Sequence, residues 1–141
     1  MNRRSFLLTS AAALALPRVV LANGETHRLR DFYAPGGGLS DLARALEGKP
    51  VTVSGFMAPP LKADSQFFVL TKQPMAVCPF CETEADWPDN IMAVYTQRKF
   101  RVIAFNRKIE TSGTLSLGAY RDPDTGFLSM VRIEDARFRR A

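Results

Sequence analysis

The sequence predicts a mainly β domain, a small five-stranded barrel with one short N-terminal helix. Three observations support this prediction. Apolar and polar residues alternate with period two in several short segments, which is typical of half-buried strands. Gly, Pro and Asp separate these segments, as they do at turns. Two of the segments contain a glycine inside an otherwise regular strand, which indicates a bend. At 141 residues, 46% hydrophobic and 23% charged, the chain has the composition of one globular domain.

Residues 1–22 are predicted to be a signal peptide. Arg3 and Arg4 form a charged start, an apolar stretch of about a dozen residues follows, and small residues mark a cleavage site. The apolar stretch is too short to cross a bilayer, which takes roughly 20 residues. The paired arginines, then one residue, then Phe6 and Leu7, resemble the twin-arginine signal. This resemblance implies export of the folded protein to the periplasm.

The predicted signal peptide changes the charge balance of the chain. The whole chain has a formal net charge of +5. Residues 1–22 contain three basic residues and no acidic ones, so residues 23–141 keep 16 basic and 14 acidic residues, a net charge of +2. A charge this small does not predict nucleic-acid binding, since nucleic-acid-binding domains usually carry a distinct basic face. The C-terminal arginines are interpreted as a solvated tail: Arg137, Arg139 and Arg140.

Residues 23–38 are predicted to be a flexible lead-in, because Asn23-Gly24 and the glycines at 36–38 interrupt regular structure. The barrel domain then covers residues 39–141. Its first element is a short helix within residues 39–48, with Ser40 as the N-cap, one apolar face, and a glycine at its end.

Five strands are predicted after this helix. They are expected at residues 50–57, 66–71, 90–96, 108–118 and 127–133. The second of these is apolar on both faces, and the fifth follows a turn rich in Asp, Pro and Gly. Residues 101–105 are ambiguous between a short strand and a helix.

Two of these strands resemble each other. Val51-Thr52-Val53-Ser54-Gly55 is echoed by Ile109-Glu110-Thr111-Ser112-Gly113. A glycine inside a strand usually marks a sharp bend or a bulge, although two such glycines can also be unrelated. Two bent strands are what a five-stranded barrel of the OB type needs to close on itself. We therefore expect an OB-like barrel in which Gly55 and Gly113 lie on strands that pair with one another or nearby.

These pieces together resemble a family of uncharacterised exported bacterial proteins with an OB-like core and a CxxC loop. The matching pieces are residues 48–59, 67–70, 78–81 and 112–127. The resemblance covers roughly residues 40–135, which is nearly the whole domain. It implies a fold and a compartment but no particular chemistry.

Cys78 and Cys81 are the two cysteines of the chain, in the order Cys-Pro-Phe-Cys. Such a pair can form a structural disulfide, which an oxidising compartment favours, or give two thiolates to a metal ion. Thiolates suit zinc or copper. Met75 would add a soft ligand that favours copper(I), whereas Glu82 or Glu84 would add the harder oxygen ligand of a zinc site.

The alternative function is a periplasmic thiol–disulfide oxidoreductase that uses Cys78 and Cys81. In thioredoxin-like enzymes this motif precedes a long helix, whose N-terminus lowers the pKa of the first thiol. Here Pro88 limits any such helix to about two turns. The acidic residues after Cys81 would also raise the pKa of a thiol by like-charge repulsion.

Other catalytic motifs are absent from the sequence. It has no phosphate-binding loop, no GxSxG elbow and no HExxH pair, and its one histidine lies in the lead-in. The sequence therefore predicts a periplasmic, non-catalytic binding or accessory protein. We expect a metal ion, zinc or copper, as ligand or a membrane transport complex as partner, with no nucleic-acid partner and no transmembrane segment after residue 22.

Overall fold

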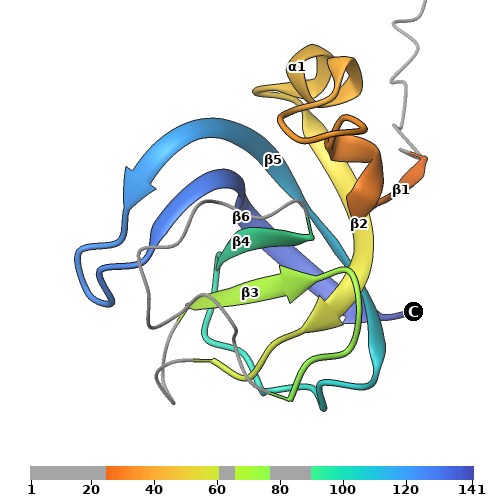
Figure 1. Ribbon diagram of the computed structural model, residues 1–141. Helices are drawn as coiled ribbons and strands as arrows, with labels where there is room; N and C mark the ends of the chain where they lie inside the picture. Colours follow the sequence, from red (N-terminus) through yellow and green to blue (C-terminus); the bar gives the residue numbers. More distant parts are fainter. Residues whose placement is uncertain (1–24, 61–65, 77–89) are drawn as a thin grey trace, which may run out of the picture.

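The computed structural model describes residues 25–60, 66–76 and 90–141 (Figure 1). These residues form one sheet of six strands with two short helical segments. The elements in chain order are β1 (Thr26–Arg28), the 3-10 helix η1 (Leu29–Phe32), α1 (Asp41–Leu46), β2 (Pro50–Met57), β3 (Phe67–Thr71), β4 (Ile91–Thr96), β5 (Lys108–Arg121) and β6 (Leu128–Arg140).

The mainly β fold class predicted from the sequence is confirmed. Each of the five predicted strands begins within one residue of the expected position. β5 and β6 are longer than predicted, since they end at Arg121 and Arg140. The C-terminal arginines are exposed, as predicted, but they do not form a tail, because they belong to β6, which pairs with β5 up to Arg140. The ambiguous segment 101–105 is neither strand nor helix.

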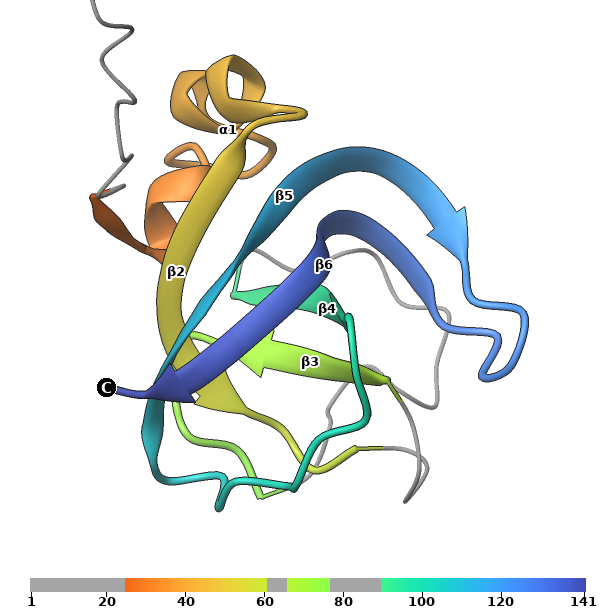
Figure 2. The ribbon, with the colours of Figure 1, turned by 180° about the vertical axis from the view of Figure 1, so that it is seen from behind.

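The last strand of the sheet, β5, also pairs with its second strand, β2. Its strand order is β1-β2-β3-β4-β6-β5, and β5 pairs in addition with β2. All these pairings are antiparallel except β1 with β2 and β4 with β6. Figure 1 shows β3 and β4 in front, and Figure 2, from behind, shows β2, β5 and β6 in front of them. The strands therefore wrap around a common interior.

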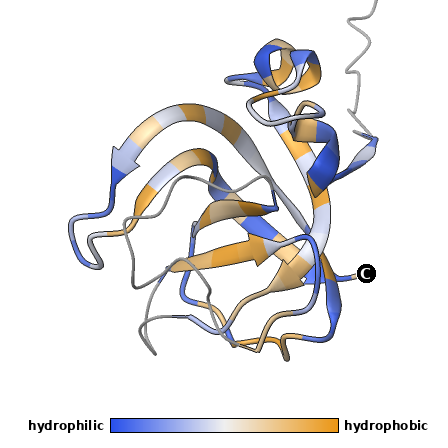
Figure 3. Ribbon diagram, in the orientation of Figure 1, coloured by the Kyte–Doolittle hydropathy of each residue, from blue (hydrophilic) through white to orange (hydrophobic). Residues whose placement is uncertain are grey.

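The main core lies in this interior and receives side chains from β2 to β6, η1 and α1. Its buried members are Leu29, Phe32, Ala43, Val51, Val53, Met57, Phe68, Leu70, Met92, Val94, Ile109, Leu115, Val131, Ile133 and Ala136. A smaller cluster around Phe67, Val69 and Phe127 lies on the other face of β3 and β4. β3 is consequently buried along its whole length, as its two apolar faces predict, and it is strongly hydrophobic in Figure 3.

β2 changes its partner near Gly55. Residues 50–56 of β2 pair with β5, whereas its last two residues pair with β3. A Cβ atom on Gly55 would lie 2.8 Å from the backbone oxygen of Thr71 on β3. Glycine is therefore needed here because two backbones approach closely, and not because of a positive φ.

Gly113 stands in the same ladder, opposite Val51 of β2. The sequence-based expectation that Gly55 and Gly113 lie on strands that pair with each other is confirmed. The β5–β6 register shifts beside Gly113, and a Cβ atom there would lie 2.5 Å from the backbone oxygen of Glu134. Because Gly113 has no side chain, the backbones of β5 and β6 can approach closely at this bulge.

The N-terminal segment differs from the flexible lead-in predicted for residues 23–38. β1 pairs in parallel with β2, and η1 places Leu29 and Phe32 in the core, where both are almost completely buried. Elements of three and four residues are too short to show a periodic hydrophobic pattern. The sequence therefore showed only the glycines and other structure-breaking residues on either side of them. The helix prediction is confirmed, since α1 begins after Ser40, whose hydroxyl accepts a hydrogen bond from the N–H of Ala43 at 3.2 Å.

Candidate functional site

The cysteine motif belongs to the connection between β3 and β4. Cys78, Cys81, Glu82 and Glu84 lie outside the described residues, as do the signal residues Arg3, Arg4, Phe6 and Leu7. The two strands pair over the full length of β3, and beyond them the N–H of Lys72 donates to the carbonyl of Asn90 at 2.9 Å. The connection 73–89 therefore leaves and re-enters the sheet at one place.

Met75 is the predicted metal ligand that the structure does describe. It is half-buried and lies four residues beyond the end of β3. The start of the connection is held by the Thr71 hydroxyl, which donates to the carbonyl of Gln73 at 2.7 Å. Within residues 25–60, 66–76 and 90–141, no three His, Cys, Asp or Glu side chains are grouped to hold a metal ion. The other ligands of a metal site at Met75 would therefore come from residues outside the described ranges.

The side chains of Tyr95 on β4 and Asp122 in the β5–β6 turn form a polar pair that joins the strand to the turn. The hydroxyl of Tyr95 donates to Oδ2 of Asp122 at 2.9 Å. The backbone N–H groups of Asp124 and Thr125 donate to Oδ1 of Asp122 at 2.9 and 2.8 Å, and the Thr125 hydroxyl donates to it at 3.0 Å. Asp122 therefore organises the turn and ties it to β4.

Burial, the hydrogen bond to Asp122 and its negative charge all raise the pKa of Tyr95. Burial by itself would also raise the pKa of Asp122. The hydrogen bonds that this carboxylate accepts from Thr125, Tyr95 and Asp124 outweigh burial and hold its pKa below the ordinary value of 3.8. Tyr95 stays protonated at neutral pH and Asp122 stays charged, so the pair has a structural role.

We expect Asp122→Asn to destabilise the protein by about 2 kcal/mol at pH 7, because the charged acceptor of four hydrogen bonds is lost. The folded-state pKa lies below the unfolded-state pKa, so this contribution is present above about pH 4 and disappears as the pH falls further. Urea unfolding at neutral and acidic pH should show the difference from the original protein shrinking in acid. Asp41→Asn is the control, because its exposed ion pair with Arg44 adds little stability. An equal loss at both pH values would contradict the prediction.

Arg132 is a buried charge that sequence reasoning missed. Its side chain reaches back along β6, and only 5% of the residue is exposed. The guanidinium donates to the carbonyl of Gly118 at 2.6 Å and to the hydroxyl of Ser116 at 3.1 Å, and it lies over the ring of Tyr120. Arg132 is thus occupied in joining β5 to β6. Alternation in β6 gave no signal for this burial, because it places Arg132 on the same face as the exposed residues Met130 and Glu134.

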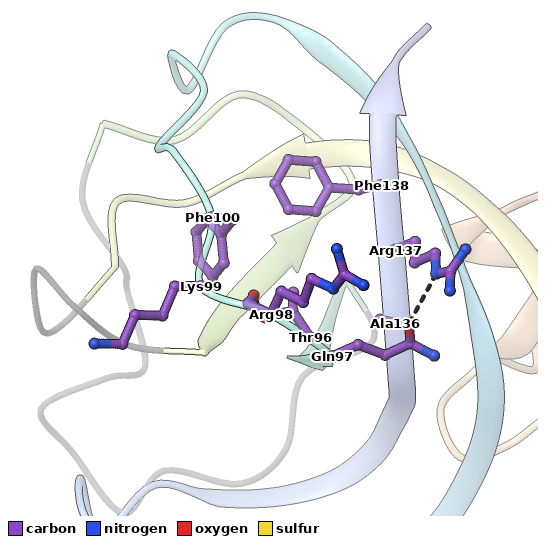
Figure 4. Close-up of a pocket in the computed structure, with 8 residues that line it drawn as sticks. All are labelled: Thr96, Gln97, Arg98, Lys99, Phe100, Ala136, Arg137 and Phe138. Carbon is purple, nitrogen blue, oxygen red and sulfur yellow. Dashed lines mark hydrogen bonds between the residues drawn. The ribbon is translucent and has the colours of Figure 1, made fainter.

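A groove of about 340 Å³ lies between β6 and the segment that follows β4 (Figure 4). Its lining residues are Thr96, Gln97, Arg98, Lys99, Phe100, Ala136, Arg137 and Phe138. Nε of Arg137 donates to the side-chain oxygen of Gln97 at 2.7 Å and joins the two sides of the groove. The groove therefore combines exposed positive charge with an aromatic wall, a composition suited to an anionic ligand.

The comparisons with known proteins show the fold and leave the chemistry open. No family model matches the chain, and no curated protein matches it. Among solved structures, the chain is similar to a DUF3299 family protein from Pseudomonas aeruginosa PAO1, with a TM-score of 0.54 and 14% sequence identity. The match covers 83% of this chain and 95% of that protein. The neighbour belongs to an uncharacterised family, and at this identity the likeness is one of fold alone.

The fold defines the chain as a small mainly β domain with a cysteine-containing connection at one end of its central strands. In the parts of the chain that the structure describes, no helix is long and apolar enough to span a membrane.

Proposed function

We propose that this protein is an exported, non-catalytic binding protein that binds a transition-metal ion through Cys78 and Cys81. The proposal places it in the periplasm, with Arg3 and Arg4 as its twin-arginine export signal. The observation that best supports the site is the anchoring of the connection 73–89 at both ends by paired, buried strands. Loops held by such a scaffold commonly carry binding residues.

The proposed scaffold is an OB-like barrel formed by β2 to β6, with β1 added outside it. The pairing order β2-β3-β4-β6-β5 and the return of β5 to β2 support this assignment. The glycines on β2 and β5, placed where backbones approach most closely, support it as well. A barrel closed in this way would hold the ends of each connection at fixed positions.

The proposed ligands are chosen by the chemistry of the connection. Two thiolates separated by two residues can bind one soft ion, and a connection with fixed ends loses less conformational freedom on binding. Met75, half-buried near the fixed start, would favour copper(I). Glu82 or Glu84 would complete a zinc site. A membrane transport complex that receives or supplies the ion is the partner we propose for such a protein.

The test is metal binding by reduced protein recovered from the periplasmic fraction. We expect about one zinc or copper(I) ion for each chain, with lower affinity at lower pH because both thiols must lose a proton. Cys78→Ser should abolish binding. Met75→Leu should lower copper(I) affinity about tenfold and leave zinc affinity unchanged if Met75 is a ligand. Met130→Leu, an exposed methionine on β6, is the matched control and should change neither.

Three outcomes would contradict the proposal. The first is absence of metal uptake together with a disulfide whose reduction potential lies well above the roughly −300 mV of structural disulfides. This result would favour the thiol–disulfide oxidoreductase function. Absence of metal uptake with a disulfide that resists reduction would leave the cysteines a structural role. Recovery of the protein only from the cytoplasmic fraction would contradict export.

A further inference from the structure

The segment between β4 and β5 is strongly basic. Between the ends of the two strands the chain carries no acidic residue. Its basic residues, together with the first residue of β5, are Arg98, Lys99, Arg101, Arg107 and Lys108, and all five are exposed. None of them forms an ion pair with a residue in the described ranges.

The neighbouring acid does not neutralise this charge. Glu110, on β5, already accepts two hydrogen bonds from Arg139 of β6, the shorter at 2.8 Å. Arg140 also lies beside the segment, because it pairs with Ile109 and because the N–H of Ala141 donates to the carbonyl of Lys108 at 3.0 Å. The end of β6 thus lies beside the segment and adds the positive charge of Arg140 to it.

Two large apolar side chains stand among these charges. Val102 is 54% exposed and Phe105 is 39% exposed. Their neighbours Phe100 and Ile103 point the other way and pack against the main core. The ring of Phe100 contacts the rings of Phe68 and Phe138, with centroids 5.3 and 5.4 Å apart.

The exposure of Val102 and Phe105 is therefore built into the fold. Phe100 and Ile103 anchor the segment to the core, and a hydrogen bond of 2.9 Å from the N–H of Arg107 to the carbonyl of Ala104 closes a turn around Phe105. Apolar side chains held in water by an anchored segment indicate an interaction surface.

We propose that this segment, residues 97–108, docks the protein onto the surface of an anionic lipid bilayer. A bilayer interface accepts both kinds of side chain at once: cations lie at the lipid phosphates, and apolar groups enter the boundary between headgroups and acyl chains. A soluble polyanion would pair with the cations but would give Val102 no apolar contact. The proposal does not depend on the metal site.

The test is sedimentation of the processed protein, recovered from the periplasmic fraction, with vesicles of phosphatidylglycerol and phosphatidylcholine in equal parts, and with vesicles of phosphatidylcholine alone. We expect binding to the mixed vesicles that weakens with added salt, and little binding to the neutral ones.

Two double variants separate charge from apolar insertion. Arg101→Gln with Arg107→Gln should weaken binding about thirtyfold, as expected for about 1 kcal/mol per cation. Val102→Ser with Phe105→Ser should weaken it about tenfold or more and keep the salt dependence. Leu128→Ser with Met130→Ser is the control, because both residues are similarly exposed on β6 away from the segment, and it should bind like the original protein.

Equal binding to neutral and anionic vesicles, or unchanged binding by the Val102 and Phe105 variant, would overturn the proposal. Tighter binding to single-stranded DNA or to an acidic peptide than to the mixed vesicles would also overturn it, and would identify the surface as a polyanion site. Displacement from vesicles by glycerol phosphate at low concentration would show recognition of the free phosphate and not of the bilayer.

Discussion

Gly113→Ala is expected to destabilise the protein by about 3 kcal/mol. The added Cβ would lie 2.5 Å from the backbone oxygen of Glu134 and 2.6 Å from Cγ2 of Ile133. Both atoms belong to β6, and the first is a backbone atom, which the hydrogen bonds between β6 and β5 prevent from moving away alone. Since small domains are stable by about 5–15 kcal/mol, urea unfolding should show a large fall in the free energy of unfolding.

The matched control for this prediction is Gly48→Ala. Gly48 has a φ of +75° and no atom near the position of a Cβ, so alanine there meets only the strain of that φ, about 1 kcal/mol. Gly55→Ala should lie between the two, because one of its close contacts is the flexible side chain of Leu70. If Gly113→Ala cost no more than Gly48→Ala, the close approach of β5 and β6 would not be the reason for this glycine.

Phe68→Ala is expected to cost about 4 kcal/mol, because it removes a completely buried ring and leaves a cavity. Phe68 also forms a three-ring cluster with Phe100 and Phe138, in which the rings meet edge to face. Loss of Phe68 removes one of the contacts that hold residues 97–107 against the core. We therefore expect limited proteolysis to cut this segment faster in the variant.

Phe67→Ala is the matched control, since it changes the preceding residue of the same strand on the opposite face. Phe67 is also buried, but it packs against Tyr95 and Phe127 in the smaller cluster. This variant should lose a similar amount of stability without faster cleavage within residues 97–107. Equally fast cleavage in the two variants would mean that global unfolding, and not the local anchor, controls access to the segment.

The strands could be predicted because their signal is local. In β2 every second residue is buried, and this period of two is visible in the sequence without any knowledge of the partner strands. The cap at Ser40 is equally local, because the hydroxyl that accepts and the N–H that donates are three residues apart. The cysteine pair and its possible chemistry were readable for the same reason.

The misjudged regions depend on partners distant in the chain. β1 is stabilised by pairing with β2, and η1 by packing of its apolar side chains in the core. The seven residues of these two elements contain no pattern that predicts either contact. β6 continues to Arg140 because β5 pairs with it, although its alternating arginines read alone as a charged tail. Arg132 is tolerated inside because Gly118 and Ser116, on the neighbouring strand, accept its hydrogen bonds.

The sequence by itself determined where five of the six strands begin, where the helix begins, and which side chains can carry chemistry. Only the tertiary structure decided which strands pair, that β5 returns to β2, and that Val102 and Phe105 remain in water while Phe100 and Ile103 are buried. The physical reason is that alternation and capping depend on neighbours within a few residues. Pairing, close approach and burial depend on contacts between segments far apart in the chain, which exist only once the chain has folded.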